Sequence, residues 1–204
     1  MKAQVLALYA RVEDAHAALP PTACSAGCDH CCHLPVDASA VEVVTLAQHL
    51  HETRDGAGIA QLRASLQAFA AVLAATPPQD RMAVRRPCPL LSDRKCSAYE
   101  ARPLSCRAFH SSAVERCVVA MKPENVNAGF RFPDRRRLEV ASHAGALLAD
   151  GARRAGRDTA IYNLVEALAV ALESPEATRA RWDAGEQVFP DDTRRFEDRV
   201  ETGG

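Results

Sequence analysis

Cys24-Ser25-Ala26-Gly27-Cys28-Asp29-His30-Cys31-Cys32 is the stretch around which this chain is organised. Four thiols stand within nine residues at the spacing C-x3-C-x2-C-C, which is far denser than the packing of a hydrophobic core requires. Gly27, just before Cys28, gives the backbone the freedom to turn so that side chains converge on one ion. This density of thiols predicts a metal site rather than a set of buried apolar side chains.

Residues 33–87 separate this group of cysteines from a second one. The second group begins in Pro87-Cys88-Pro89-Leu90-Leu91, continues in Cys96-Ser97-Ala98-Tyr99-Glu100-Ala101-Arg102-Pro103-Leu104-Ser105-Cys106-Arg107 and ends at Cys117. All eight cysteines of the chain belong to these two groups. The candidate metal ligands are therefore Cys24, Cys28, Cys31, Cys32, Cys88, Cys96, Cys106 and Cys117.

Sites built from thiolates alone select zinc, iron–sulfur clusters or copper(I). If the first segment coils, three of its thiolates face one point, and a thiol of the second group can complete the coordination sphere. Adjacent side chains diverge from the backbone, so Cys31-Cys32 indicates either more than one metal or one ligand beside a spare thiol. Two alternatives stay open: thiols that only pack, above all the isolated Cys117, and a disulfide scaffold.

The polar side chains next to the cysteines are candidates for supporting roles. His30 and His33 flank the first group, but sulfur is already in excess there, so we expect them to face solvent or to donate to a ligand. Arg102 and Arg107 lie within the second group, where guanidinium groups offset the negative charge of thiolates or hydrogen-bond to sulfur. We expect these two arginines to support the bound cofactor without ligating it.

Charge and hydropathy argue against several classes of partner. The 25 basic and 26 acidic residues give a net charge of −1, which provides no general field for nucleic acid or anionic membrane. Arg135-Arg136-Arg137 and Arg153-Arg154 are candidate phosphate contacts, but we expect the Arg135–Arg137 run to be a solvated face with local carboxylate pairing. No apolar run reaches the roughly 18 residues of a membrane span, and charges from Arg11 onward interrupt the N-terminal run before a signal peptide is complete. We expect a cytoplasmic protein with no membrane partner.

The composition favours an all-α fold. Hydrophobic residues make up 48% of the chain but aromatic residues only 5%, a profile that suits helices better than sandwiches or barrels. Apolar periodicity predicts helices over residues 2–19, 39–54, 59–75 and 159–173, a long helix beginning at Pro133-Asp134, and another beginning at Ser174-Pro175-Glu176. Capping boxes at Ser39 and Glu42, Ser97 and Glu100, and Ser112 and Glu115 predict three helix starts.

The region between residues 79 and 107 lacks long periodicity and is rich in proline and charge, so we expect bound metal to order it. The predicted architecture is an irregular helical domain in which a cysteine-rich metal-binding loop region packs against a helical bundle. One core suffices for a chain of 204 residues, so residues 1–189 are expected to form a single domain containing the cluster region 24–107. Residues 190–204 are charged and end in glycine, which predicts a disordered tail.

Both cysteine segments resemble those of the YkgJ-type cysteine-cluster proteins, a family of zinc- or iron-chelating domains. The resemblance covers residues 24–107: Cys24-x3-Cys28-x2-Cys31-Cys32 is similar to the opening signature, and residues 87–107 are similar to the second almost residue for residue. It implies a bacterial protein whose cysteines bind zinc or an iron–sulfur cluster, with a motif that flagellin lysine methylases also carry. It implies no settled reaction, and Cys117 lies outside the matched portion.

Two functions follow from these observations. The leading interpretation is a metal-binding protein that holds an iron–sulfur cluster or zinc through two groups of cysteines and acts as a chelator or carrier. The alternative is a metal-dependent enzyme that uses the cysteine-bound metal for redox chemistry or methyl transfer. C-x3-C-x2-C is similar to the cluster loop of radical enzymes that use S-adenosylmethionine, but the pattern lacks the succession of strands that those enzymes need. The sequence names no catalytic residue and no protein partner.

Overall fold

The structure, a computed structural model, describes residues 1–125 and 134–194. Its longer helices are α1 (Lys2–Ala17), α2 (Ala40–Thr53), α3 (Gly56–Ala75), α6 (Arg135–Arg154), α7 (Leu164–Ala171) and α8 (Pro175–Asp183). Shorter elements are α4 (Leu104–Ala108), α5 (Val114–Ala120) and the strands β1 (Asp37–Ser39), β2 (Leu91–Ser92), β3 (Lys95–Cys96) and β4 (Ile161–Asn163). Turns of 3-10 helix lie at His30–His33, Pro78–Ala83, Tyr99–Ala101, Pro123–Asn125 and Asp191–Thr193. The mostly helical content confirms the fold class predicted from composition.

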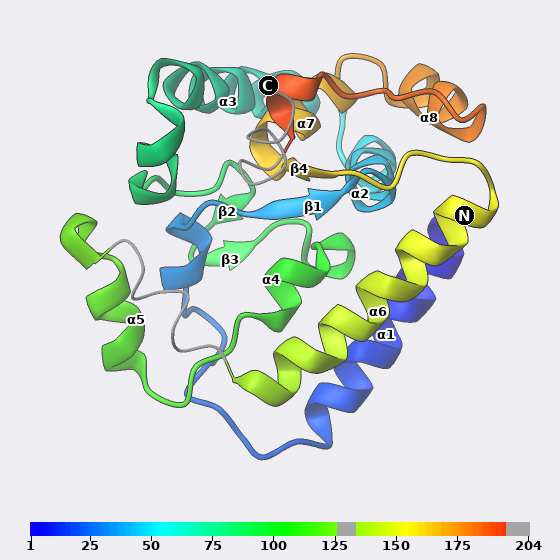
Figure 1. The fold of residues 1–204 in the computed structure, drawn as a ribbon. Helices are drawn as coiled ribbons and strands as arrows, with labels where there is room; N and C mark the ends of the chain where they lie inside the picture. Colours follow the sequence, from blue (N-terminus) through cyan, green and yellow to red (C-terminus); the bar gives the residue numbers. More distant parts are fainter. Residues whose placement is uncertain (126–133, 195–204) are drawn as a thin grey trace.

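Helix α2 lies at the centre of the core. Its side chains Val43, Leu46 and Leu50 are fully buried, and the helix packs against α7, α8 and α1. Helix α3 packs on α7, and α1 lies beside α6 (Figure 1). One connected cluster of buried hydrophobic side chains runs from Val5 to Phe189. The hydrophobic effect therefore stabilises the packing of the first helix together with the last.

A two-stranded ladder joins two distant parts of the chain. Strands β1 and β4 pair antiparallel, with Ala38 opposite Tyr162. In Figure 1 this ladder lies between α3, α7 and α8 on one side and α1, α4 and α6 on the other. Each strand runs directly into a helix, because Ser39 is the N-cap of α2 and Asn163 is the N-cap of α7. The ladder therefore sets the starting points of two core helices.

The helix predicted over residues 159–173 is wrong at its beginning. Residues 161–163 form β4, and the helix starts only at Leu164, where the Asn163 side chain accepts hydrogen bonds from the amides of Val165 and Glu166. The apolar pattern of this segment fits a buried strand as well as a helix, and the β-branched Ile161 and aromatic Tyr162 suit a strand. Pairing with β1, more than a hundred residues earlier, decides between the two.

The three predicted capping boxes have different outcomes. Ser39 and Glu42 form the predicted box at the start of α2. The cap at Ser97 is wrong, because the Ser97 hydroxyl donates to the Leu90 carbonyl at 2.8 Å, but one helical turn does follow before Arg102, as the 3-10 turn Tyr99–Ala101. The helix predicted from Ser112 is present as α5, which carries Cys117, but its N-cap is Ala113 and no side chain caps it. At Ser97 the local capping pattern fails because the same hydroxyl bonds to another acceptor.

The other predicted helix starts lie close to those observed. Asp134 is the N-cap of α6, and its side chain accepts from the amides of Arg136 and Arg137. Pro175 begins α8 as predicted, although the Ser174 side chain makes no capping bond. Helix α3 starts at Gly56, earlier than expected, because the Asp55 side chain caps it through the Gly58 amide. Local capping thus locates most of the helix boundaries.

Helix α3 is long and apolar enough, by length and composition, to cross a membrane. Polar side chains such as Gln61 and Arg63 interrupt it, which is why no uninterrupted apolar run was found in the sequence. Leu62, Leu66 and Leu73 form a buried stripe along this helix, although only 22% of its most apolar window is buried. Core helices pass the same test of length and composition, so this property is weak evidence for a membrane span.

The segment predicted to be a tail begins with ordered structure. Asp191–Thr193 form a 3-10 turn, Thr193 is buried, and Arg194 makes an antiparallel bridge to Tyr162. The prediction for residues 195–204 lies outside the described residues.

Candidate metal centre

The first group of cysteines follows the end of α1 as a series of tight turns. Gly27 has a φ of 87°, a left-handed conformation that side chains with a Cβ rarely adopt. The Cys28 amide donates to the Ser25 carbonyl at 3.0 Å, and the Cys32 amide donates to the Asp29 carbonyl at 2.9 Å. Because consecutive turns replace a continuous helix, the four sulfurs lie along a folded loop rather than on one helix face.

The second group is connected to the first by the backbone itself. The Cys88 amide donates to the Cys32 carbonyl at 2.8 Å, so the two motifs are adjacent in space. After Cys88 the chain forms the β2–β3 hairpin, in which Leu91 pairs with Cys96. Its turn residues, Asp93 and Arg94, have φ values of 49° and 59°, as in the primed turns that join short hairpins. The hairpin returns Cys96 towards Cys88.

Two adjoining cavities contain the eight cysteines in their walls. One, called here the sulfur cavity, has a volume of about 440 Å³ and is lined by Cys24, Cys28, Cys31, Cys32, Cys96, Cys106 and Cys117. The other, called here the apolar cavity, has a volume of about 460 Å³ and is lined by Cys31, Cys32, Cys88, Cys96 and Cys106 together with many apolar side chains. Cys31, Cys32, Cys96 and Cys106 belong to both walls, so the two sequence motifs meet at this common boundary.

The cysteines do not converge on a single point. Within residues 1–125 and 134–194, no group of three or more cysteine, histidine or acidic side chains is placed to hold one ion. All eight cysteines are free thiols, which does not support a disulfide scaffold. The donor chemistry nonetheless fits zinc or an iron–sulfur cluster, because seven sulfurs line one cavity. Ligation by these residues therefore requires sulfurs to move towards one another.

Burial and neighbouring sulfurs control the ionisation of these thiols. Burial raises the pKa of Cys88 to about 12, although the Leu90 amide opposes this by donating to the Cys88 sulfur. Burial also raises the pKa of Cys96 and Cys106. The thiols of Cys88, Cys96 and Cys106 are therefore protonated near neutral pH, so metal ligation by them would release protons.

The adjacent pair Cys31 and Cys32 ionises in two separated steps. The Cys31 thiol donates a hydrogen bond to the Cys32 sulfur, which lowers the pKa of Cys32. The same bond, together with burial and the negative charge of Cys32, raises the pKa of Cys31. A thiol that loses its proton near neutral pH is the nucleophilic and metal-binding form of cysteine. Cys32 is therefore the member of the pair that first becomes a thiolate.

The two arginines predicted to support the cofactor lie in different places. Arg102 lines both cavities, and its guanidinium group lies 4.0 Å from the centre of the Tyr99 ring. Arg107 lines neither cavity. It is 2% exposed and donates to the carbonyls of Arg102, Tyr99 and Glu100. Its role beside the cofactor stays a prediction, because its hydrogen bonds are made to the backbone of the second motif and to Glu13 of α1.

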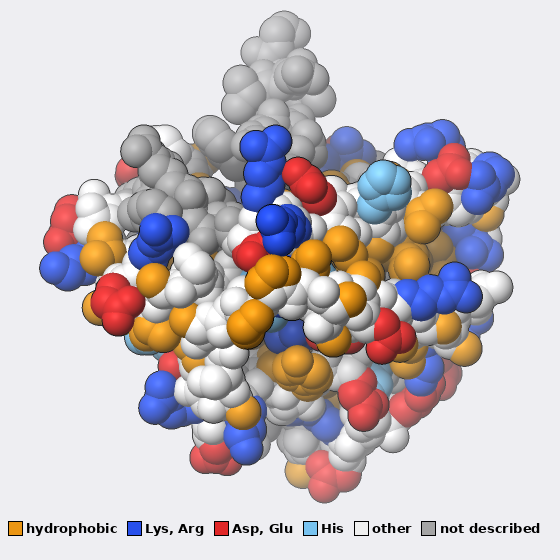
Figure 2. Space-filling model, turned by 90° about the horizontal axis from the view of Figure 1, so that it is seen from below, with side chains coloured by type: hydrophobic (Ala, Val, Ile, Leu, Met, Phe, Trp, Pro, Cys, Tyr) orange, Lys and Arg blue, Asp and Glu red, His pale blue; other side chains and the backbone are white. Residues whose placement is uncertain are grey.

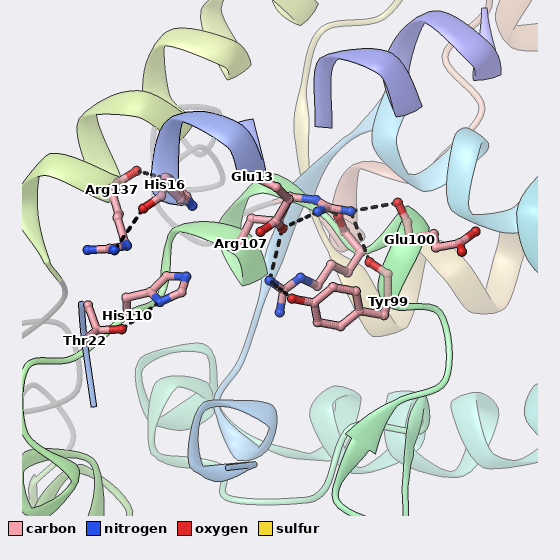
Figure 3. Close-up of polar contacts among 9 residues, drawn as sticks. Glu13, His16, Thr22, Tyr99, Glu100, Arg107, His110 and Arg137 are labelled. Atoms are coloured by element: carbon pink, nitrogen blue, oxygen red, sulfur yellow. Dashed lines mark hydrogen bonds and ion pairs between the residues drawn. The ribbon is translucent and has the colours of Figure 1, made fainter. Parts of the chain in front are cut away.

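One carboxylate of α1 binds both arginines. Glu13 pairs with Arg102 at 3.2 Å. It also forms an ion pair with Arg107, as Figure 3 shows. Burial alone would raise the pKa of Glu13, but the two guanidinium groups outweigh it and hold the pKa below its usual range. This ion-pair cluster attaches the second cysteine motif to α1.

The turn after α4 also belongs to the site, and the sequence analysis did not include it. The Ser111 amide donates to the Cys24 sulfur at 3.4 Å, and the Ser111 carbonyl accepts from the Ala23 amide. His110 lines the sulfur cavity, and its ring lies near Thr22 (Figure 3). The spacing of the cysteines carries no signal for these contacts, because they depend on how α4 returns to the first motif.

The run Arg135–Arg137 was predicted to be solvated and to pair with nearby carboxylates. Arg135 and Arg136 are exposed as predicted, whereas Arg137 is buried, although it does pair locally with Asp134. Arg135 is exposed and pairs with Glu139 one turn later. Arg137 is buried and donates to the carbonyls of His16 and Pro20, as Figure 3 shows for His16. These bonds join the start of α6 to the end of α1 and to the segment that leads into the first cysteine group.

The remaining predicted side chains lie at the edge of the site. His30 lines the sulfur cavity, whereas the His33 ring contacts the Asp29 carbonyl at 3.1 Å. Cys117 is carried by α5, which packs against the 3-10 turn His30–His33. It lines the sulfur cavity, and burial raises the pKa of its thiol. The structure thus brings Cys117 to the first group rather than to the second.

Comparison with known proteins gives one match. A family model with the description "CxxCxxCC: Putative zinc- or iron-chelating domain" matches residues 23–128, slightly more than half of the chain. This confirms the resemblance seen in the two cysteine motifs and extends it through α5 and Cys117. Neither the curated proteins nor the solved structures include a significant match.

Proposed function

The chain belongs to the CxxCxxCC family, and we propose from this premise that it binds zinc or an iron–sulfur cluster through its two groups of cysteines. One observation carries the proposal: thiols from both motifs form the common wall of two adjoining cavities. Residues so far apart in the sequence share this wall because the Cys88 amide bonds to the Cys32 carbonyl. In this proposal the protein is a metal chelator or carrier.

The surroundings of the sulfur cavity support a bound centre made of thiolates. Its described lining contains no aspartate or glutamate but includes Arg94, Lys95 and Arg102. Cationic side chains offset the charge that several thiolates carry once their protons leave. Magnesium and calcium prefer oxygen ligands, so the donor set favours zinc, iron–sulfur clusters or copper(I) over those ions.

Because the sulfurs are separated, we expect the coordination site to form only when the metal binds. Since no three ligands are already gathered among the described residues, part of the binding free energy must move the cysteine loops into position. Bound metal would then pack the loops of both motifs against the helices around them. We place the protein in the cytoplasm, because a reducing compartment keeps such thiols available for metal.

Metal analysis of anaerobically purified protein tests the proposal. We expect zinc or iron at one or more equivalents per chain, measured by elemental analysis that also counts copper. A brown protein with broad visible absorption and inorganic sulfide identifies an iron–sulfur cluster, whereas a colourless protein with stoichiometric zinc identifies a zinc site. A chain that holds none of these metals, even after anaerobic reconstitution, contradicts the proposal.

Single substitutions in the common wall test which motif supplies ligands. Cys31→Ser and Cys96→Ser each remove one sulfur from the boundary between the cavities and should lower the metal content per chain. Ser25→Ala, in the same loop as Cys31, is the matched control and should leave the metal content unchanged. If neither cysteine variant loses metal, ligation by both motifs is wrong.

A metal-dependent enzyme is the second candidate, and the apolar cavity favours it. Open space for an organic molecule directly beside the cysteines suits a redox or methyl-transfer reaction at the bound centre. Isothermal calorimetry with S-adenosylmethionine tests methyl transfer. Absence of binding to the metal-loaded protein would remove that reaction from consideration.

A further inference from the structure

The apolar cavity has the size and lining of a small-molecule site. Its volume of about 460 Å³ falls within the range of ligand pockets in proteins. Apolar side chains reach it from several separate segments: Leu34 and Val36 before β1, Met82, Leu91 of β2, Leu138 of α6 and Ile161 of β4. Such a site is assembled by the tertiary fold rather than by a single loop.

Several of these apolar side chains are incompletely buried. Figure 2 shows one face of the molecule, on which exposed hydrophobic side chains lie among basic and acidic ones. Val36, Leu91 and Ile161 keep part of their surface accessible, and Leu138 is 43% exposed. Their exposed surface adjoins the hollow, since each of them lines it. An apolar ligand placed there would remove this surface from water, which is a favourable change.

The charged groups in the wall already have partners inside the protein. Glu42 accepts hydrogen bonds from the Ser39 amide and hydroxyl and from the Leu104 amide. Arg102 is paired with Glu13, and Asp37 also has a partner. Each carboxylate and guanidinium group of the described lining therefore already has a partner within the protein, although the Nε of Arg102 has none of its own. A charged molecule would lose its hydration there and would have to compete with these internal partners for a counter-ion.

We infer that the apolar cavity binds an uncharged, mainly hydrocarbon small molecule beside the cysteine-bound centre. The inference rests on the proposed function only for the presence of the metal, because the cavity itself is formed by the described residues. Cys31, Cys32, Cys96 and Cys106 line both cavities, so a ligand here contacts the wall that the centre shares. Occupation of one cavity then changes the surroundings of the other.

Two fluorescent probes with the same aromatic skeleton test the charge preference. N-phenyl-1-naphthylamine is uncharged, whereas 1-anilinonaphthalene-8-sulfonate adds one sulfonate. With the full chain as purified, we expect saturable fluorescence enhancement by the uncharged probe at one equivalent and affinity at least about tenfold weaker for the sulfonate. Absence of saturable binding by the uncharged probe, or equal binding of both, overturns the inference.

Cavity-filling substitutions test where the probe binds. Leu138→Trp enlarges an exposed side chain at the cavity, and Leu147→Trp makes the same change at an exposed position of α6 that does not line it. We expect Leu138→Trp to weaken binding of N-phenyl-1-naphthylamine at least about tenfold, whereas Leu147→Trp leaves it unchanged. Leu91→Trp, in β2, is a second variant in which a larger side chain fills the same cavity. Unchanged binding by both filled variants places the probe elsewhere and overturns the inference.

Metal content measured on the same samples separates the two proposals. Leu138→Trp should lose the probe but keep its metal, whereas Cys31→Ser should lose metal. In the loaded protein, N-phenyl-1-naphthylamine should shift the visible bands of an iron–sulfur cluster or of cobalt(II) substituted for zinc. If the chain holds no metal even after anaerobic reconstitution but still binds the probe, the cavity proposal stands and only the metal centre is contradicted. If the visible bands of the metal-loaded protein do not change when the probe binds, the claim that the ligand and the metal centre share a wall of cysteines is contradicted.

Discussion

At the scale of single residues, Arg107 shows how a side chain beside a metal motif acts on the backbone. Its guanidinium group satisfies three carbonyls of the segment from Tyr99 to Arg102 and pairs with Glu13. It also lies over the Tyr9 ring at 4.5 Å from the ring centre. A lysine has no planar set of donors and cannot replace these bonds together.

Arg107→Lys should therefore lower the free energy of unfolding by about 2–4 kcal/mol, because buried carbonyls lose charge-assisted hydrogen bonds. Urea unfolding followed by circular dichroism measures the change. Arg135→Lys is the control, since the Arg135 side chain is 90% exposed, and it should stay within about 0.5 kcal/mol of the parent protein. Equal losses of unfolding free energy in the two variants would contradict the proposal that Arg107 stabilises the backbone of residues 99–102.

His16 predicts a specific pH dependence of stability. Burial lowers the pKa of this imidazole below its ordinary value, and its Nε2 bonds to the Arg137 carbonyl. The unfolded chain then binds more protons than the folded protein between the lowered pKa and about pH 6.5. The contribution of His16 is fully present above that window, and it is lost as the pH falls through it.

His16→Gln should make the unfolding free energy less dependent on pH across this window. Denaturant titrations at constant metal content, from about pH 5 to pH 8, measure the slope. His143→Gln, at an exposed position of α6, should retain the parent profile. A His16→Gln profile as steep as that of the parent would show that other groups cause the loss, with His110 the next candidate because burial also lowers its pKa.

At the scale of elements, Glu42 connects three helices. It completes the capping box of α2, accepts from the Leu104 amide at the start of α4, and accepts from the Tyr9 hydroxyl of α1. The capping box was visible in the sequence because both members are local. The bonds to α1 and α4 were not, because their donors lie 33 and 62 residues away.

Glu42→Gln should lower the unfolding free energy by about 2–4 kcal/mol. The amide replaces one accepting oxygen by a group that donates, and at least one buried donor loses its acceptor. Glu139→Gln on the exposed face of α6 should change stability by less than about 0.5 kcal/mol. Thermal and urea unfolding of both variants measure the difference, and a Glu42→Gln chain as stable as the parent would contradict this role.

At the scale of the whole molecule, the metal is expected to hold together segments that share little apolar core. Residues 23–33 and 86–97 contain few fully buried side chains, and their cysteines are only partly buried. Helices α1, α2 and α7, in contrast, belong to one connected hydrophobic cluster. Loss of metal should therefore open the cysteine loops before it unfolds the helices.

Metal removal by a chelator under reducing conditions should lower the melting temperature. A site occupied at a thousand times its dissociation constant stabilises by about 4 kcal/mol, which corresponds to roughly 10 °C for a domain of this size. Differential scanning calorimetry measures the shift, and hydrogen exchange should locate the lost protection in residues 23–33 and 86–97. Recovery on adding back the native metal is the control. An unchanged melting temperature after complete metal loss would mean that the metal does not stabilise the fold.

The local sequence determined most helix boundaries, for physical reasons that are themselves local. Ser39 with Glu42 and Asp134 before Arg135 cap their own helices, so capping identifies the beginnings of α2 and α6. The segment 161–163 could not be assigned in the same way, since its apolar pattern suits a strand and a helix alike. The sequence wrongly predicted Ser97 to be a helix cap, because its hydroxyl donates to the Leu90 carbonyl instead.

The sequence by itself determined the chemistry of the candidate centre: eight thiols in two dense groups, a donor set that selects soft metals, and membership of a chelating family. Only the tertiary structure decided which thiols share a wall, that Arg102 lines the cavities while Arg107 braces the backbone, and that an apolar hollow adjoins the sulfurs. The sequence shows the chemistry of the ligands because the type of donor atom depends only on the identity of each amino acid. The arrangement depends on bonds between distant segments, such as that from the Cys88 amide to the Cys32 carbonyl, and these exist only in the folded chain.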